Sequence, residues 1–277
     1  MGHVTVGREN SANIDLYYED HGVGTPVVLI HGYPLTGSSW EKQILVLLNA
    51  GFRVIRYDRR GFGASSRPAL GYDSDTLARD LHILLVALDL RETILVGFAL
   101  GTGEVVRYLG TYGSNRVRQV VLLAPLQPFL LKMADNPEGV DGSVFDGMKQ
   151  ALLVDRPAYL MTFLEQCYNV DVLGGIRISE SALQFSWIEA IGASAGATLA
   201  CIQAWLTDFR LDLPRIDVPV LVVQGDQDRI LPYSATARRL PGLIQNASFV
   251  VVEGGPHAIG WTHAEDVNRA LLDFLGR

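Results

Sequence analysis

The chain has 277 residues, of which 48% are hydrophobic, so it is long enough and apolar enough to bury a large core. Its formal net charge is −7, and its densest basic spots are two Arg-Arg pairs. This charge balance argues against a nucleic acid or an anionic membrane as partner, because both need clustered cations. A small uncharged or weakly charged molecule is the expected partner, and the sequence leaves a homo-oligomer open.

The N-terminal residues have a strand-like alternation and lack the basic and apolar segments of a secretory signal. No run reaches the roughly 18 to 20 apolar residues of a membrane span. The two cysteines, Cys167 and Cys201, are too few for a disulfide scaffold and are expected to be reduced thiols, although one bridge between them stays open. A cytoplasmic location is therefore expected.

In chain order, two alternating segments come first, at residues 4–6 and 14–19, with a turn signal at residues 10–13. They predict an antiparallel hairpin at a sheet edge. Short β-branched runs then alternate with helical stretches, which indicates a parallel sheet covered on both faces. These runs lie at residues 26–30, 52–57, 92–96, 117–123, 218–223 and 248–253.

The β/α rhythm stops after Pro125 and resumes near Asp217. The segment between them is helical in pattern and rich in aromatic residues, with loop signals at residues 135–139. We expect one α/β domain with a mostly parallel sheet of about eight strands, formed by residues 1–125 and 217–277. Residues 126–216 are expected to insert a helical cap.

The most informative motif is Gly97-Phe98-Ala99-Leu100-Gly101, directly after one predicted strand and before a helix. Its glycine spacing is that of the nucleophile elbow, G-x-S-x-G. A strand that turns sharply into a helix strains the central residue and crowds its neighbours two positions away, which must then be small. The central side chain is exposed at the positive end of the helix. Any strand–Gly–turn–helix string could resemble this motif, so it needs support from elsewhere.

That support comes from three other strand ends. His31-Gly32-Tyr33 follows residues 26–30 and could offer the N–H of Tyr33, with that of Leu100, as an oxyanion hole. Asp226 and Asp228 follow residues 218–223, and His257 follows residues 248–253. The order nucleophile, acid, base is one of the known orders of a catalytic triad. Each residue alone could be an ordinary loop residue, but together they predict serine-hydrolase chemistry.

With these motifs the chain resembles, from end to end, the cofactor-free (non-haem) haloperoxidase branch of the α/β-hydrolases, which includes esterases, perhydrolases, lactonases and γ-lactamases. The resemblance implies an α/β-hydrolase fold, His257 as base, Asp228 rather than Asp226 as acid, and neither cofactor nor metal. It rests on the stretches at residues 16–20, 31–35, 57–63, 97–104, 135–139, 207–210, 228–232, 255–257 and 261–263.

The chain departs from that branch at the centre of the elbow, where the resemblance implies serine and the chain has Ala99. Alanine has no hydroxyl to deprotonate, so no acyl-enzyme can form there. Either an active ester or lactone hydrolase carries a targeted Ser-to-Ala change, or the chain is a natural pseudoenzyme that binds a small molecule. The complete set of acid, base and oxyanion loops favours the first interpretation.

Substrate choice is expected to come mainly from the insertion. An apolar acyl pocket would suit medium-chain esters or lactones, while each of its candidate residues could also be ordinary core. The candidates are Phe129, Leu130, Phe163, Trp187, Trp205 and, beside the base, Ile259.

Overall fold

The computed structural model describes residues 1–276 and contains one eight-stranded sheet of order β1-β2-β4-β3-β5-β6-β7-β8. Strands β1 and β2 form an antiparallel hairpin, β2 pairs antiparallel with β4, and the remaining neighbours are parallel. The strands are β1 (Gly2–Glu9), β2 (Ala12–His21), β3 (Pro26–Ile30), β4 (Arg53–Tyr57), β5 (Thr93–Phe98), β6 (Val117–Leu123), β7 (Val220–Gly225) and β8 (Ala247–Val252).

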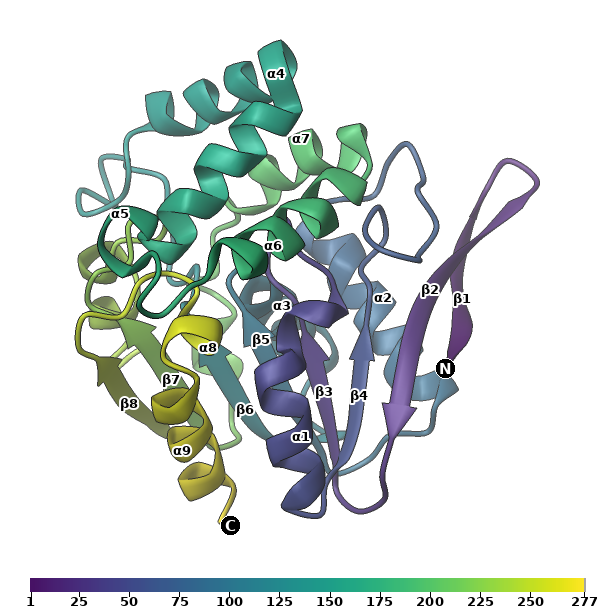
Figure 1. Cartoon of the computed structure of the whole chain (residues 1–277). Helices are drawn as coiled ribbons and strands as arrows, with labels where there is room; N and C mark the ends of the chain where they lie inside the picture. The colour runs from purple at the N-terminus through teal and green to yellow at the C-terminus, as the bar shows by residue number, and fades with distance from the viewer. Residues whose placement is uncertain (277) are drawn as a thin grey trace.

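Helices cover both faces of this sheet (Figure 1). Helices α1 and α9 lie on one face and α2 and α3 on the other, as the continuous apolar runs of the central strands predict. The helices are α1 (Glu41–Asn49), α2 (Ser74–Ala87), α3 (Leu100–Tyr112), α4 (Gly142–Tyr168), α5 (Val170–Leu173), α6 (Glu180–Gly192), α7 (Ala195–Ala204), α8 (Ile259–Thr262) and α9 (Ala264–Leu275). Short 3-10 turns lie at Gly37–Trp40, Leu213–Arg215, Tyr233–Ala235 and Ala237–Arg239.

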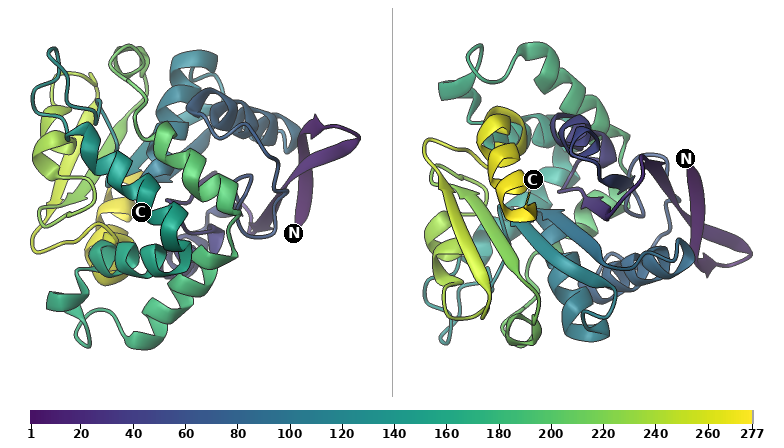
Figure 2. Two further views of the ribbon diagram at one scale, coloured as in Figure 1. Left: turned by 90° about the horizontal axis from the view of Figure 1, so that it is seen from above. Right: turned by 90° about the horizontal axis from the view of Figure 1, so that it is seen from below.

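The predicted α/β-hydrolase fold is thus confirmed, with helices α4 to α7 inserted between β6 and β7. These helices lie over the end of the sheet where the parallel strands terminate (Figures 1 and 2). Helix α4 is kinked at Asp155, whose backbone is not helical and whose carboxylate accepts the N–H of Ala158 at 3.0 Å. Pro157 removes a helical hydrogen bond at the same place, so this part of the insertion consists of two packed helical halves.

The core is centred on β3 and β5, which are covered on both sides. Residues 27–30 of β3 and all of β5 are buried. Within residues 1–276, no one helix combines the length and apolar character needed to cross a membrane; α6 and α7 pass that test only as a pair bent by 95°.

Candidate active site

Ala99 occupies the turn between β5 and α3. The elbow geometry predicts an exposed central side chain, but Ala99 is buried in the folded chain. Its backbone has φ 48° and ψ −114°, a combination that costs a non-glycine residue about 1–3 kcal/mol and needs support from its surroundings. The two glycines provide room for this turn. A Cβ on Gly97 would lie 2.7 Å from the Gly101 carbonyl oxygen, and one on Gly101 would lie 2.4 Å from that of Ile30.

His257 and Asp228 meet at the ends of β8 and β7. The Nδ1 atom of His257 lies 2.9 Å from Oδ2 of Asp228, and both side chains are almost fully buried. The other carboxylate oxygen accepts the backbone N–H groups of Ile230 (2.9 Å) and Leu231 (2.8 Å). These contacts fix the carboxylate. Among residues 1–276, Nε2 of the imidazole has no hydrogen-bond partner, and this is the atom that acts as base in a triad.

Asp226, the other aspartate of this loop, has a different environment. Its Oδ1 accepts the backbone N–H of Gly254 at 2.8 Å, and the side chain is exposed. Asp226 thus ties two loops together at the surface, while Asp228 holds the imidazole.

The loop after β3 contacts the elbow directly. A Cβ built on Gly32 would lie 3.2 Å from the Cβ of Ala99 and 2.6 Å from the Phe98 ring. Phe98 also packs against the His257 ring, with 5.1 Å between their centroids. His257, the elbow and the loop that ends in Tyr33 therefore share one neighbourhood. The N–H of Leu100 belongs to the first turn of α3, where N–H groups have no partner within the helix.

An apolar cavity of about 220 Å³ lies under the insertion. Leu130, Phe163 and Trp205, three of the residues expected for an acyl pocket, are among its lining residues. The rings of Phe163 and Trp205 pack edge-on against Tyr33, at 5.5 and 5.4 Å between centroids, so the cavity adjoins the oxyanion loop. Further lining residues are Val140, Val144, Phe145, Met148, Tyr159, Thr162, Gln166, Arg229 and Ile230.

Three other predicted pocket residues lie outside this lining. Phe129 is covered by the Arg210 guanidinium at 5.1 Å. The Trp187 indole donates to the Pro157 carbonyl at 3.1 Å and so ties α6 to α4. Ile259 begins α8 and is buried next to Gly255.

Gln224 belongs to the site and is not among the residues predicted from the sequence. Its amide nitrogen donates to Asp228 Oδ2 at 3.1 Å and to the Leu231 carbonyl at 2.6 Å, in a fully buried position. The available signal was an amide at the end of an otherwise apolar strand, because a buried polar side chain needs partners.

Both cysteines are free and buried in the insertion. Burial raises the pKa of the Cys201 thiol to about 12 and that of Cys167 well above its usual value. Because the thiolate is the nucleophilic form, neither cysteine is suited to replace the missing hydroxyl.

Comparison with known proteins shows the family of this chain. A protein of Synechocystis sp., provisionally named a non-heme chloroperoxidase, is 65% identical over 275 residues, covering 99% of this chain and 100% of that one. A bifunctional esterase/perhydrolase of Acinetobacter calcoaceticus is 31% identical and covers 99% of both chains. The crystal structure of a bromoperoxidase from Bacillus anthracis superposes with a TM-score of 0.96 at 44% identity, covering 100% of this chain and 99% of that one. The alpha/beta hydrolase fold family matches residues 25–264, and the chain belongs to that family.

Proposed function

We propose that this chain is a serine-hydrolase framework for carboxylic esters or lactones in which Ala99 occupies the nucleophile position. One observation carries the proposal. A paired base and acid, His257 and Asp228, share a buried neighbourhood with a strained elbow whose central residue differs from serine by one oxygen. The combination of φ 48° and ψ −114° at Ala99 is costly for a non-glycine residue, and strained backbone of this kind clusters at functional sites.

In the serine form, obtained by Ala99→Ser, the hydroxyl oxygen attacks the carbonyl carbon while Nε2 of His257 takes its proton. Asp228 holds the imidazole and stabilises its charged form. The N–H groups of Tyr33 and Leu100 receive the developing oxyanion. The base returns its proton to the leaving oxygen, and the acyl-enzyme forms. Water, activated by His257, then releases the carboxylic acid and restores the serine.

A perhydrolase side activity follows if hydrogen peroxide replaces that water. The acyl group then leaves as a peracid, and the serine is restored in the same way. The peracid oxidises a halide ion to hypohalous acid and is itself reduced to the carboxylic acid. No metal takes part in these steps. The names of the similar proteins, chloroperoxidase, bromoperoxidase and esterase/perhydrolase, support this side activity.

The cavity under residues 126–216 supports an apolar acyl group as the part of the substrate that is recognised. Its walls are mainly aliphatic and aromatic, and Arg229 is the charged residue in its lining. Such walls suit a medium-length acyl chain better than a charged group. We propose that residues 126–216 act as a cap whose side chains select the substrate, and that the protein works on small molecules in the cytoplasm.

The test is hydrolysis of a short p-nitrophenyl ester and of an acyl lactone by the Ala99 and Ala99→Ser forms. We expect the alanine form to be at least ~10³-fold slower, the scale of a lost nucleophile. His257→Ala in the serine background is the control, because it removes the base and keeps the hydroxyl.

As it stands, with Ala99, the protein is expected to bind these substrates without turnover. This property also supports the second candidate, a natural small-molecule binding module. A folded serine form that binds the ester but remains inert would favour the binding module over the hydrolase. Equal activity of both forms would place the nucleophile elsewhere.

A further inference from the structure

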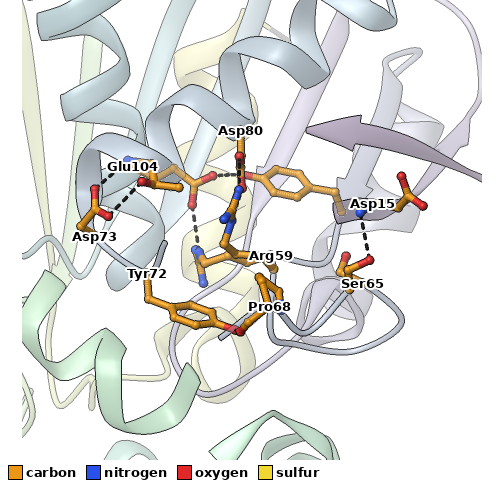
Figure 3. Close-up of polar contacts among 12 residues, drawn as sticks. Asp15, Arg59, Ser65, Pro68, Tyr72, Asp73, Asp80 and Glu104 are labelled. Atoms are coloured by element: carbon orange, nitrogen blue, oxygen red, sulfur yellow. Dashed lines mark hydrogen bonds and ion pairs between the residues drawn. The ribbon is translucent and has the colours of Figure 1, made fainter. Parts of the chain in front are cut away.

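A buried ionic cluster lies directly beneath the elbow and the oxyanion loop. The Arg59 guanidinium donates to Glu104 of α3 at 2.9 Å, and the Tyr57 hydroxyl donates to the other oxygen of the same carboxylate. Figure 3 shows the Glu104 carboxylate next to Arg59. All three side chains are fully buried. A second nitrogen of the guanidinium donates to the carbonyl oxygen of His31 at 2.8 Å. The cluster therefore connects α3, the helix of the elbow, with the loop after β3.

The side chain of His31 extends this hydrogen-bond network to the carbonyl group of Gly32. Its Nε2 accepts the backbone N–H of Arg59 at 2.9 Å, and its Nδ1 lies 2.9 Å from the Gly32 carbonyl oxygen. Burial and the nearby Arg59 charge hold the pKa of His31 well below its usual value, so the imidazole is neutral. With Nε2 accepting, the proton is on Nδ1, which donates to Gly32.

That hydrogen bond acts on the peptide group that matters for catalysis. The Gly32 carbonyl and the Tyr33 N–H belong to one planar trans peptide and point in opposite directions. Fixing the carbonyl oxygen therefore fixes the direction of the N–H. The backbone N–H of Leu35 donates to the same oxygen at 3.1 Å. Donors of an oxyanion hole work because they are aligned before the reaction begins.

We propose that Arg59, Glu104 and His31 are positioning residues that align the Tyr33 N–H with the oxyanion. The inference rests on the proposed function, since it assigns these residues to the same reaction. A buried ion pair is weak evidence for stability, because desolvation of the two charges offsets their attraction. The cluster also holds the carbonyl groups of His31 and Gly32 in place. These contacts give the cluster a role beyond stability.

The chain itself provides a matched control. Arg60, the next residue, forms an equally buried ion pair with Asp80 of α2, with N–O distances of 2.5 and 2.7 Å. Figure 3 shows Asp80 near the Arg59–Glu104 pair. The Arg60 guanidinium donates to Asp80, whereas that of Arg59 donates to Glu104 and to the carbonyl oxygen of His31. Each pair joins a buried arginine to a buried carboxylate, Glu104 for Arg59 and Asp80 for Arg60, and the two pairs differ in their connection to the oxyanion loop.

The experiment compares Arg59→Lys with Arg60→Lys in the Ala99→Ser background. Lysine keeps the charge and loses the fork that reaches Glu104 and His31 together. For Arg59→Lys we expect kcat to fall about 10-fold with KM within about 2-fold, a part of the effect of losing an oxyanion donor. For Arg60→Lys we expect both constants within about 2-fold of the parent. The Ki of a boronic acid, whose adduct places an oxygen in the oxyanion hole, should rise with the loss of kcat.

If a lysine variant fails to fold, the comparison is repeated with Glu104→Gln and Asp80→Asn. Tyr57→Phe is a further variant of the cluster, which removes a hydroxyl without changing the charge. Equal losses of kcat in the two matched variants, or an unchanged kcat in Arg59→Lys, would overturn the inference while the proposed function stands. An inactive Ala99→Ser parent would overturn the proposed function, and the inference with it.

Discussion

The sheet end and the inserted helices of this protein differ in how much freedom they leave to their side chains. At the elbow, added methyl groups on Gly97 and Gly101 would meet backbone atoms at 2.7 and 2.4 Å. Under the insertion, a cavity of about 220 Å³ remains, and the buried Tyr33 hydroxyl, Tyr159 hydroxyl and Trp205 indole N–H have no partner among the described residues. The sheet end is built for one geometry, whereas the insertion has room for a ligand.

This difference suggests that the two regions serve different functions. Backbone contacts at the strand ends fix the chemistry, which then tolerates little change. Side chains of the insertion surround most of an apolar cavity, which suits substrate choice. Substitutions at the sheet end should therefore affect kcat or folding, and substitutions in the insertion should affect KM and selectivity.

The largest effect is expected from removing the base. His257→Ala in the Ala99→Ser background should lower kcat by at least about 10⁴-fold, because both the attack and the deacylation need proton transfer. Steady-state hydrolysis of p-nitrophenyl acetate measures it, with circular dichroism as the check on folding. A loss of less than 10-fold in a folded variant would mean that another group serves as base.

The next largest effect should distinguish the two aspartates of the loop after β7 by their effect on kcat. Asp228→Asn should reduce kcat about 10³-fold or more, since it disturbs the tautomer and orientation of His257. Asp226→Asn should remain within about threefold of the parent, because an amide oxygen can still accept the Gly254 N–H. The same ester assay decides between them, and a larger loss in Asp226→Asn would reverse the assignment of the acid.

Disturbing the packing at the elbow is expected to lower the free energy of unfolding. Gly101→Ala should lower the free energy of unfolding by about 2–4 kcal/mol, because the new methyl group meets the Ile30 carbonyl. Gly147→Ala is the matched control in α4, where an added Cβ has open space. Because alanine is a better helix former than glycine, this substitution should raise the free energy of unfolding by about 0.5–1 kcal/mol. Urea unfolding compares the two. An unchanged stability in Gly101→Ala would show that the elbow is looser than its contacts indicate.

In the insertion, Met148→Ala should raise the KM for a hexanoate ester about 10-fold, which is the scale of lost pocket contacts. The KM for an acetate ester and the kcat for both esters should remain nearly unchanged. Leu153→Ala on the same helix is the control, because that side chain is 64% exposed and lies outside the cavity lining. An equal rise of KM for both esters would argue against this cavity as the acyl pocket.

The smallest effect is expected at the thiols. Burial keeps Cys167 and Cys201 protonated near neutral pH, with the pKa of Cys201 raised to about 12. The folded protein should therefore react slowly with iodoacetamide at pH 8, while the protein unfolded in guanidinium should react at both positions. Rapid labelling of the folded protein would mean that the insertion opens readily.

The sequence predicted the sheet end better than the insertion, for physical reasons. The run of strands and helices and the glycines at residues 97 and 101 follow from backbone geometry, which has few solutions. The family resemblance implied Asp228 rather than Asp226 as the acid, and in the structure Asp228 is the aspartate that contacts His257. Of the residues expected for the acyl pocket, Leu130, Phe163 and Trp205 line this cavity, whereas Phe129 and Trp187 of the insertion and Ile259 outside it do not. An apolar side chain looks the same in a sequence whether it lines a cavity or fills a core.

The His31–Arg59–Glu104 cluster shows the same limit for charged residues. Its motifs contributed to the family resemblance, yet their spacing gave no sign that three side chains from separate segments meet beneath one loop. Such contacts depend on how the strands are ordered in the sheet.

The central claim, that the site is complete except for one oxygen at residue 99, is tested most directly by covalent labelling. An alkyl fluorophosphonate bonds to an activated serine oxygen and releases fluoride, so intact-mass and peptide analysis can locate the adduct. We predict stoichiometric labelling at residue 99 in the Ala99→Ser form, greatly slowed by His257→Ala, and no adduct at an active-site residue in the Ala99 form. Labelling of the Ala99 form in this site, or a folded serine form that stays unlabelled, would contradict the account.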